Sequence, residues 1–399
     1  MEKRNAVETA ADNEEGSCAG VSDSGKRQIW SDYMSHVLVI NPILYTSETD
    51  CIPRVRSIKD TMIYALCLGF LREGQQVTLI AAEDYRPTEE EEYAFPVVWM
   101  KTVWHGIFKP RCFPYMPALR GYLRKHKEYD LIISSEVFAT WSYTAARVRP
   151  DKTVIWHELA KHNNMMHRIP SRIWYRFVAG LFMQKVTVVP RSEAAADFVG
   201  QFSRRVSDTI IDHGVDVEQM PQAEADGKRE QFAVVSQLIG RKRIDKTIDS
   251  FAAFWNKGHR DYRLYIIGGG ELEEELRQQA KHLCPEEAVV FSGRLTHEQL
   301  LPLVAQSKAL LVSTEKDNNM VSVVESIAVG TPVITTSVPY NASYIRREEL
   351  GIVQDNWNED ALERICSNNE MYAANCAAYR EKLSNVYCAR QFLTVMREN

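Results

Sequence analysis

The side chains best suited to chemistry are two carboxylates, Asp317 and Glu325, in the loop and helix that follow an apolar run at residues 309–312. The run is typical of a short buried strand, and Asn318 or Asn319 can cap the helix. In strand–loop–helix units of this kind, ligands bind at the carboxyl end of the strand, where the first N–H groups of the helix face an anion. This stretch therefore predicts a binding site for an anionic ligand.

Glu325 is unusual for its place in the expected helix. Val321, Val324 and Ile327 fall on one helical face, and Gly330 ends the helix. Glu325 lies beside this apolar face, so we expect it to be partly buried. A buried carboxylate is costly unless hydrogen-bond donors meet it, and two sugar hydroxyls would do so. The alternative is a solvated glutamate on the exposed edge of the helix.

Polar residues follow other expected strands in similar places. Gln237 and Lys242 come after the first strand of the second half of the chain, and Gly268 opens a run of three glycines after the next strand. Such glycines let a backbone approach a phosphate, although a tight turn is the better interpretation of three glycines alone. His157 follows a strand of the first half, in the kind of place where ligands bind, although a lone His is more often structural.

The stretch around the two carboxylates resembles the donor site of the family 4 retaining glycosyltransferases, whose fold is the two-domain GT-B type. That family has an acidic residue, seven intervening residues, a Glu, and then small residues followed by Gly, Pro, Val and Ile. Asp317 and Glu325 hold this spacing, and the run from Glu325 to Ile334 follows the pattern. Asp317 replaces the usual Glu, and the Asn-Asn-Met after it replaces the usual Gly-Phe-Gly. The resemblance covers residues 232–345 and extends more thinly over the rest.

The resemblance implies transfer of a sugar from a nucleotide-diphosphate donor to an acceptor hydroxyl, with retention of configuration. In this interpretation Glu325 holds the ribose, and Asp317 with the amides of residues 319–322 holds the donor sugar and phosphates. Lys242 stabilises the departing diphosphate, and His157 contacts the donor sugar from the first domain. The predicted catalytic residues are His157, Lys242 and Asp317. The predicted donor-binding residues are Gln237, Gly268, Arg294, Asn318, Asn319, Met320, Val321, Ser322 and Glu325.

The leaving-group site departs from the family pattern at one position. Gln237 stands where the family has an Arg, and because Gln brings no charge we expect weaker stabilisation of the diphosphate. Arg241 or Arg243 is a candidate to compensate. The chain has no Asp-x-Asp and no Cys/His cluster with zinc spacing, so Lys242 and the helix start near Val321 are expected to do a metal's electrostatic work. We predict no metal and no cofactor, with the nucleotide sugar as co-substrate. The front-face mechanism that the family implies needs no protein nucleophile.

Apolar runs alternate with helix-like segments along the chain, which is typical of parallel sheets with helices on both sides. We predict the α/β class, with two doubly wound, Rossmann-like domains that face each other across a cleft, as in the GT-B type. A strand at residues 209–211 is expected to complete the first half. The predicted parts are a disordered tail at 1–29, an acceptor-binding domain at 30–215, a donor-binding domain at 216–377, and a helix at 378–399 that packs back on the first domain.

The composition is ordinary for a globular protein, with 45% hydrophobic and 25% charged residues. No apolar run is long enough for a membrane span, and the first thirty residues contain no signal-peptide core. The eight cysteines form no Cys-x-x-Cys pair, so we expect reduced thiols in a cytoplasmic protein.

Positive charge is concentrated in the first half of the chain. Residues 100–185 contain fifteen Lys and Arg against five Asp and Glu, whereas the whole chain has a net charge of −5. Aromatic residues lie among these cations, which suits an anionic membrane interface, although a basic surface that only aids solubility is an equal alternative. We expect a peripheral enzyme at the inner face of the cell membrane, acting on a glycan or lipid-linked acceptor and not on nucleic acid. The clusters concerned are Trp104, Phe108, Lys109, Arg111, Phe113 and Tyr115 in one loop, and Arg168, Arg172, Trp174, Tyr175, Arg176 and Phe177 along one helix.

Two other functions are compatible with the sequence. A sugar-nucleotide 2-epimerase shares the two-domain fold and would need acid–base residues that face the sugar ring. A non-catalytic GT-B protein would serve as a binding module, and the Asp and Gln departures make this a substantive alternative. UDP and GDP are both open as the donor nucleotide.

Overall fold

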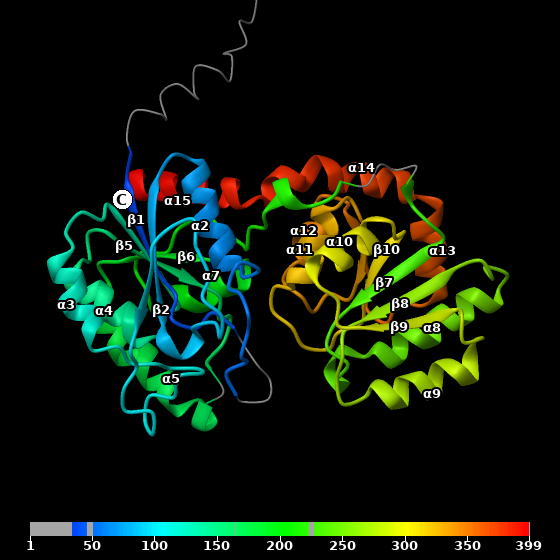
Figure 1. Ribbon diagram of the computed structural model, residues 1–399, viewed down its shortest axis with the longest axis horizontal. Helices are drawn as coiled ribbons and strands as arrows, with labels where there is room; N and C mark the ends of the chain where they lie inside the picture. The colour runs from blue at the N-terminus through cyan, green and yellow to red at the C-terminus, as the bar shows by residue number, and fades with distance from the viewer. Residues whose placement is uncertain (1–33, 46–50, 164, 223–226, 399) are drawn as a thin grey trace, which may run out of the picture. The chain divides into compact units, whose positions relative to one another are not determined.

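The computed structural model describes residues 34–45, 51–163, 165–222 and 227–398. The tail predicted at residues 1–29 lies outside the described residues. The chain forms two six-stranded parallel sheets, each flanked by helices (Figure 1). The predicted α/β class with two doubly wound parallel sheets is confirmed. Within the described ranges, no helix combines the length and the apolar character needed to cross a membrane.

The first sheet has the strand order β3-β2-β1-β4-β5-β6, and every neighbouring pair is parallel. Its central strands are apolar along most of their length because parallel strands between helices are buried on both faces. The strands are β1 (His36–Ile40), β2 (Gln76–Ala82), β3 (Val97–Met100), β4 (Leu131–Ser135), β5 (Thr153–His157) and β6 (Thr187–Pro190). The helices are α2 (Met62–Arg72), α3 (Ala118–Lys125), α4 (Thr140–Val148), α5 (Ile169–Ile173), a π-helical turn at Trp174–Ala179, α6 (Gly180–Phe182) and α7 (Glu193–Gly200).

The second sheet repeats this order, β12-β11-β10-β7-β8-β9, from the second half of the chain. In both sheets the winding reverses between the first and fourth strands, which are β1 and β4 or β7 and β10, and ligands of doubly wound folds bind at that edge. The strands are β7 (Gln231–Val235), β8 (Arg263–Ile267), β9 (Val289–Gly293), β10 (Ala309–Val312), β11 (Val333–Thr335) and β12 (Gly351–Val353). The helices are α8 (Ile244–Asn256), α9 (Glu273–Leu283), α10 (His297–Ala305), α11 (Val321–Ala328), α12 (Ala342–Arg347), α13 (Glu359–Ser367), α14 (Asn369–Tyr379) and α15 (Asn385–Glu398).

The C-terminal helix α15 packs against α2 and joins the core of the first sheet (Figure 1). Phe392 is fully buried, and its ring centroid lies 6.3 Å from that of Phe70 and 5.4 Å from that of Trp156. The two helices approach closely because Gly69 has no side chain: a Cβ there would lie 2.2 Å from the carbonyl oxygen of Asn385. The end of the chain is therefore fastened to the first sheet by packing that a larger residue at position 69 would break.

The prediction of a strand at residues 209–211 is wrong. The edge strand β6 forms an isolated bridge with earlier residues, where the Val188 N–H donates to the Arg205 carbonyl at 2.8 Å. Residues 209–211 give it a single bond, from the Ile211 N–H to the Pro190 carbonyl at 3.0 Å. Ile211 is buried in the hydrophobic core of the first sheet, and its carbonyl accepts a hydrogen bond from Trp156 Nε1 at 2.7 Å. Of these three residues only Ile211 is buried, and a side chain satisfies its carbonyl.

Candidate active site

Asp317 gathers cations at the carboxyl edge of β7 and β10. Its Oδ2 accepts hydrogen bonds from Lys242 Nζ at 2.8 Å and from Thr314 Oγ1 at 2.6 Å, and its Oδ1 accepts one from Arg241 Nη1 at 2.8 Å. Burial raises the pKa of Asp317, but the bonds from Lys242, Thr314 and Arg241 outweigh burial, so the pKa lies below its usual value. One carboxylate thus holds two cations, and the cluster has a net positive charge suited to a diphosphate.

The cation that accompanies Lys242 is Arg241. Arg243 adopts a left-handed backbone conformation, with φ of 48°, and is drawn to Asp245 at 2.7 Å and to Glu315. Gln237, at the position where the resembled family has an Arg, has an exposed side chain near the end of β7. Of the two candidates for compensating the missing charge at Gln237, the structure brings Arg241 to Asp317.

Gly268 is required by the close approach of a neighbouring loop. Its φ is +136°, and a Cβ at this position would lie 1.8 Å from the Ser236 carbonyl oxygen, which no side chain allows. The exposed Arg294 lies next to the same turn, with its Nε 3.7 Å from the position of a Cβ on Gly269. The glycine run is thus explained by the tight turn, and Arg294 lies beside it.

Glu325 is buried on α11, as expected from its place beside the apolar face, and is 8% exposed. Its carboxylate meets His297 at the start of α10, with 3.0 Å between His297 Nε2 and Glu325 Oε1. The hydrogen bond to Glu325 raises the pKa of His297 to about 9 against the opposing effect of burial, and Asp60, 3.6 Å from His297 Nδ1, adds to the rise. His297 is a site residue that sequence reasoning missed, because only the packing of α10 on α11 brings it to Glu325.

The start of α11 differs from the expected cap. Met320 is the N-cap residue and no side chain caps the helix, so the prediction of capping by Asn318 or Asn319 is wrong. Asn319 Nδ2 donates instead to Asp212 Oδ1 at 2.5 Å and to the Arg191 carbonyl at 3.2 Å. Asn318 is half-buried in the same loop.

The first residue of α11 also departs from the expected apolar face. Val321 is 36% exposed, whereas the residues one turn further on are buried. The amides of Val321 and Ser322 lie in the first turn and have no preceding helical carbonyl to bond, so this helix start can meet an anion. The Met320 N–H is already bonded by Asn341 Oδ1 at 2.5 Å.

His157 is fully buried at the end of β5 and is held by a carboxylate from the neighbouring strand. Its Nδ1 lies 2.9 Å from Glu136 Oε2, and Glu136 Oε1 accepts from the Glu158 N–H at 2.8 Å. Burial would raise the pKa of Glu136, but the charges of His157 and Arg191 and the hydrogen bonds lower it below its usual value. Nδ1 therefore donates to an ionised carboxylate. His157 Nε2 is buried without a hydrogen-bond partner among the described residues.

Glu136 was missed by sequence reasoning. It follows β4, one strand away from His157, and has a φ of +64°, which is uncommon for a residue with a Cβ. Its position at the carboxyl end of a strand was the available signal, because ligands of such folds bind at that edge.

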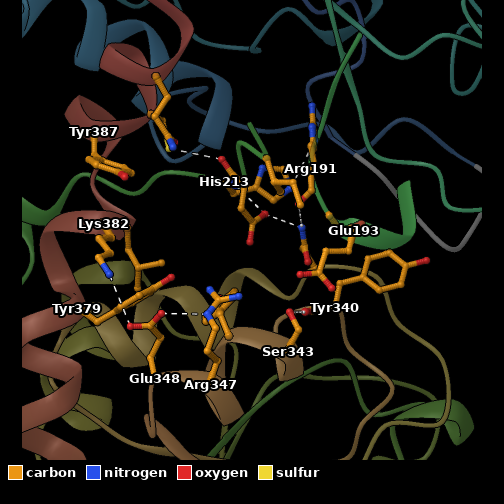
Figure 2. Close-up of a pocket in the computed structure, with 18 of the residues that line it drawn as sticks. Arg191, Glu193, His213, Tyr340, Ser343, Arg347, Glu348, Tyr379, Lys382 and Tyr387 are labelled. Atoms are coloured by element: carbon orange, nitrogen blue, oxygen red, sulfur yellow. Dashed lines mark hydrogen bonds and ion pairs between the residues drawn. The ribbon is translucent and has the colours of Figure 1, made fainter. Parts of the chain in front are cut away.

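The Asn319–Asp212 contact borders a pocket of about 360 Å³ (Figure 2). Arg191 and His213 line it on the side of the first sheet, and Tyr340 on the side of the second. Asp212 is half-buried, and its removal from water raises its pKa to about 7, partly offset by the hydrogen bond from the N–H of His213. The loop after β10 is thereby tied to the residues that follow β6.

Arg191 links this pocket to the surroundings of His157. Its N–H donates to the His157 carbonyl at 2.8 Å, and its Nη1 donates to Glu158 Oε2 at 3.0 Å. The guanidinium carbon lies 3.6 Å from the centroid of the Trp156 ring, a cation–π contact that fixes the side chain. Among the described residues, no group of three or more His, Cys, Asp or Glu side chains is placed to hold a metal ion.

Two family profiles match the chain. The profile "Glycosyltransferase Family 4" matches residues 60–219, and "Glycosyl transferases group 1" matches residues 216–373. Among curated proteins, alpha-monoglucosyldiacylglycerol synthase of Streptococcus pneumoniae is 21% identical over 323 residues, which cover 75% of this chain and 72% of that protein.

Solved structures show the same fold. The crystal structure of Anabaena HepE in complex with UDP-glucose has a TM-score of 0.63 at 16% identity and covers 91% of this chain and 100% of that chain. WaaG, a glycosyltransferase involved in lipopolysaccharide biosynthesis, has a TM-score of 0.58 at 14% identity and covers 91% of this chain and 100% of that chain. Sucrose-phosphate synthase from Thermosynechococcus elongatus has a TM-score of 0.64 at 15% identity, with coverage of 91% and 98%. The two family profiles match successive parts of the chain. The chain therefore belongs to the family 4, or group 1, glycosyltransferases of the GT-B fold.

Proposed function

We propose that the protein transfers a sugar from a nucleoside-diphosphate sugar to an acceptor hydroxyl with retention of configuration. The observation that carries this proposal is the cluster of Lys242 and Arg241 on Asp317, at the carboxyl edge of β7 and β10. The start of α11 and the buried Glu325 follow Asp317 along the chain. A diphosphate needs cations and free amides, and a ribose needs a buried acceptor.

Each residue then has a distinct role. Lys242, supported by Arg241, stabilises negative charge on the departing diphosphate, and the amides at Val321 and Ser322 add the field of the helix start. Glu325 accepts hydrogen bonds from the ribose hydroxyls. His157, oriented by Glu136, is assigned to the donor sugar because its Nε2 has no hydrogen-bond partner among the described residues.

The reaction takes place on one face of the sugar. The bond from the anomeric carbon to the diphosphate breaks, its electron pair stays on the phosphate oxygen, and the acceptor oxygen bonds to the anomeric carbon from the same face. That phosphate oxygen accepts the proton of the acceptor hydroxyl, so no protein nucleophile is required. The positive charge that a metal ion would supply comes from Lys242 and Arg241, and we propose that neither metal nor cofactor is needed.

For the donor and the acceptor, the similar proteins supply the support. HepE is solved with UDP-glucose, which favours a UDP-sugar, with GDP-sugars as the second choice. The named relatives include a glycolipid synthase and a protein of lipopolysaccharide biosynthesis, which favours a glycan or lipid-linked acceptor in polysaccharide or glycolipid synthesis. We propose a cytoplasmic enzyme, peripheral at the inner face of the cell membrane.

Donor binding followed by product analysis tests this function. A panel of UDP- and GDP-sugars is titrated by calorimetry with EDTA present, and the anomeric proton of the transferred sugar is then followed by NMR. We expect one nucleotide series to bind, unaffected by the chelator, and the product to keep the donor's anomeric configuration. An inverted product or full loss in EDTA would contradict the mechanism. An epimerised nucleotide sugar without transfer would support the epimerase, and binding without turnover would support the non-catalytic module.

A further inference from the structure

A row of apolar residues is exposed on the helical segment that runs from α5 through the π-helical turn to α6. Ile169, Ile173, Phe177 and Leu181 follow one another at intervals of four residues, and each is between 53% and 66% exposed. Single exposed apolar side chains are common, but an ordered row on one segment is typical of a surface that binds a protein, a membrane or an apolar ligand.

A row of arginines accompanies the apolar row. Arg168, Arg172 and Arg176 each stand one position before an apolar member, and all three are exposed. The sequence has no Asp or Glu between Glu158 and Glu193. We call these seven residues the arginine–apolar face. Its cations lie in a segment that carries no acidic side chain of its own.

The opposite side of this segment is fixed in the core. Tyr175, Ala179 and Met183 are buried in a cluster with Val137, and Trp174 Nε1 donates to the Val137 carbonyl at 2.8 Å. The arginine–apolar face is therefore held outward by packing behind it, and its exposure does not come from a frayed helix.

The loop that precedes α3 packs on the core side of this segment and exposes apolar side chains of its own. Trp104 is 66% exposed and Ile107 is 77% exposed. Ring contacts lead from Trp104 to Phe108 (6.2 Å), to Phe113 (6.0 Å) and on to Trp174 of the helical segment (5.3 Å). Phe113 and Tyr175 belong to the core, whereas Trp104 reaches solvent. The two aromatic and basic clusters noted in the sequence therefore contain both core residues and exposed residues.

We propose that the arginine–apolar face docks on the headgroup region of an anionic lipid bilayer. The four apolar side chains enter the boundary between headgroups and acyl chains, and the three arginines meet lipid phosphates beside them. The charge selects this occupant, because an exclusively cationic apolar surface complements a layer of anionic headgroups. This docking face rests on the proposed function, which supplies the lipid-linked acceptor. Through it the first domain would meet that acceptor at the bilayer surface.

Cosedimentation with vesicles tests the proposal. The full chain is incubated with phosphatidylcholine vesicles that contain either no anionic lipid or about 30% phosphatidylglycerol. Three forms are compared: the wild type, a variant with Arg168→Gln, Arg172→Gln and Arg176→Gln, and a variant with Ile173→Ser and Phe177→Ser. The controls are Arg120→Gln, Arg124→Gln and Lys125→Gln together, which make the same charge change on exposed positions of α3, and Met371→Ser, an exposed apolar residue of α14.

We expect the wild type to pellet with anionic vesicles and to bind neutral ones at least tenfold more weakly. Each face variant should lower anionic binding about tenfold or more, and the controls less than threefold. Raising salt from about 0.05 M to about 0.5 M should weaken binding, because screening shortens the reach of the arginines. Thermal unfolding and donor binding measured on each variant show whether it is folded.

Equal failure to bind both vesicle types would overturn the proposal, as would anionic binding that folded face variants retain. Loss of a wild-type dimer in the Phe177 variant, without vesicle binding, would assign the face to a second copy of the chain instead. Vesicle binding and donor turnover are separate readouts, so turnover without vesicle binding refutes only this inference, and vesicle binding without turnover refutes only the proposed function.

Discussion

Glu325→Ala is the perturbation that the structure interprets most directly. The carboxylate is 8% exposed, sits on a helix whose neighbouring residues are buried, and is already bonded on one oxygen by His297 at 3.0 Å. The proposed ribose hydroxyls would be its other partners. Truncation removes the acceptor for both hydroxyls and the nearer of the two carboxylates that contact His297.

The size of the effect follows from those contacts. A hydrogen bond to a charged acceptor is worth about 1.5–3 kcal/mol. Because His297 occupies part of the carboxylate, the loss should be nearer to one such bond than to two. A change of about 2–3 kcal/mol corresponds to an increase in the Kd of the nucleoside diphosphate of roughly 30- to 150-fold.

Calorimetric titration of UDP and GDP into the wild type and Glu325→Ala measures this change. Glu325→Gln is the second variant, because it keeps the shape of the buried side chain and should lie between the two. Glu286→Ala is the matched control, since Glu286 has an 82% exposed side chain in the turn after α9. A Kd for Glu325→Ala within about threefold of the wild-type value, which is under 1 kcal/mol, would refute the donor-site assignment.

Three further predictions follow from the ionisable groups. Lys242→Ala should lower kcat about 100-fold while KM changes less than about fivefold, because charge on the diphosphate grows as the bond to the sugar breaks; a change in KM alone would make Lys242 a binding residue. The pKa of His297 is raised from 6.5 to about 9, so its protonated form stabilises the fold fully below pH 6.5, and this contribution is lost as pH rises through 9. After allowance for solvent screening, the free energy of unfolding measured by denaturant titration should fall by about 1–2 kcal/mol over that range. His297→Gln should not show this fall. Burial raises the pKa of Asp212 from 3.8 to about 7, so Asp212→Asn should gain stability relative to the wild type by about 2–4 kcal/mol between pH 4 and pH 8, and a pH-independent difference would show that Asp212 is not the titrating group.

Sequence patterns predicted the strands well because a parallel strand between two layers of helices is apolar throughout. The run at residues 309–312 is β10, and the burial of Glu325 followed from helical spacing on the next element. The strand predicted at 209–211 failed because an apolar run reports burial, and Ile211 is buried with its carbonyl bonded to the side chain of Trp156.

The parts of the site that escaped prediction depend on contacts between distant segments. His297 reaches Glu325, Glu136 reaches His157, and Asn319 turns away from its expected cap to reach Asp212. No local period or spacing relates these pairs, because each is set by how one helix or strand packs on another. Residue type indicated only that polar groups stood at strand ends.

Release of nucleoside diphosphate from a panel of UDP- and GDP-sugars, without acceptor and with EDTA present, tests the central claim most directly. The account predicts slow hydrolysis of one nucleotide series by the wild type. The rate should fall about 100-fold in Lys242→Ala, the equivalent of losing about 2.7 kcal/mol of transition-state stabilisation. No release from any donor, or equal release by the wild type and Lys242→Ala, would contradict the assignment of the Lys242–Asp317 cluster to the chemistry of sugar transfer.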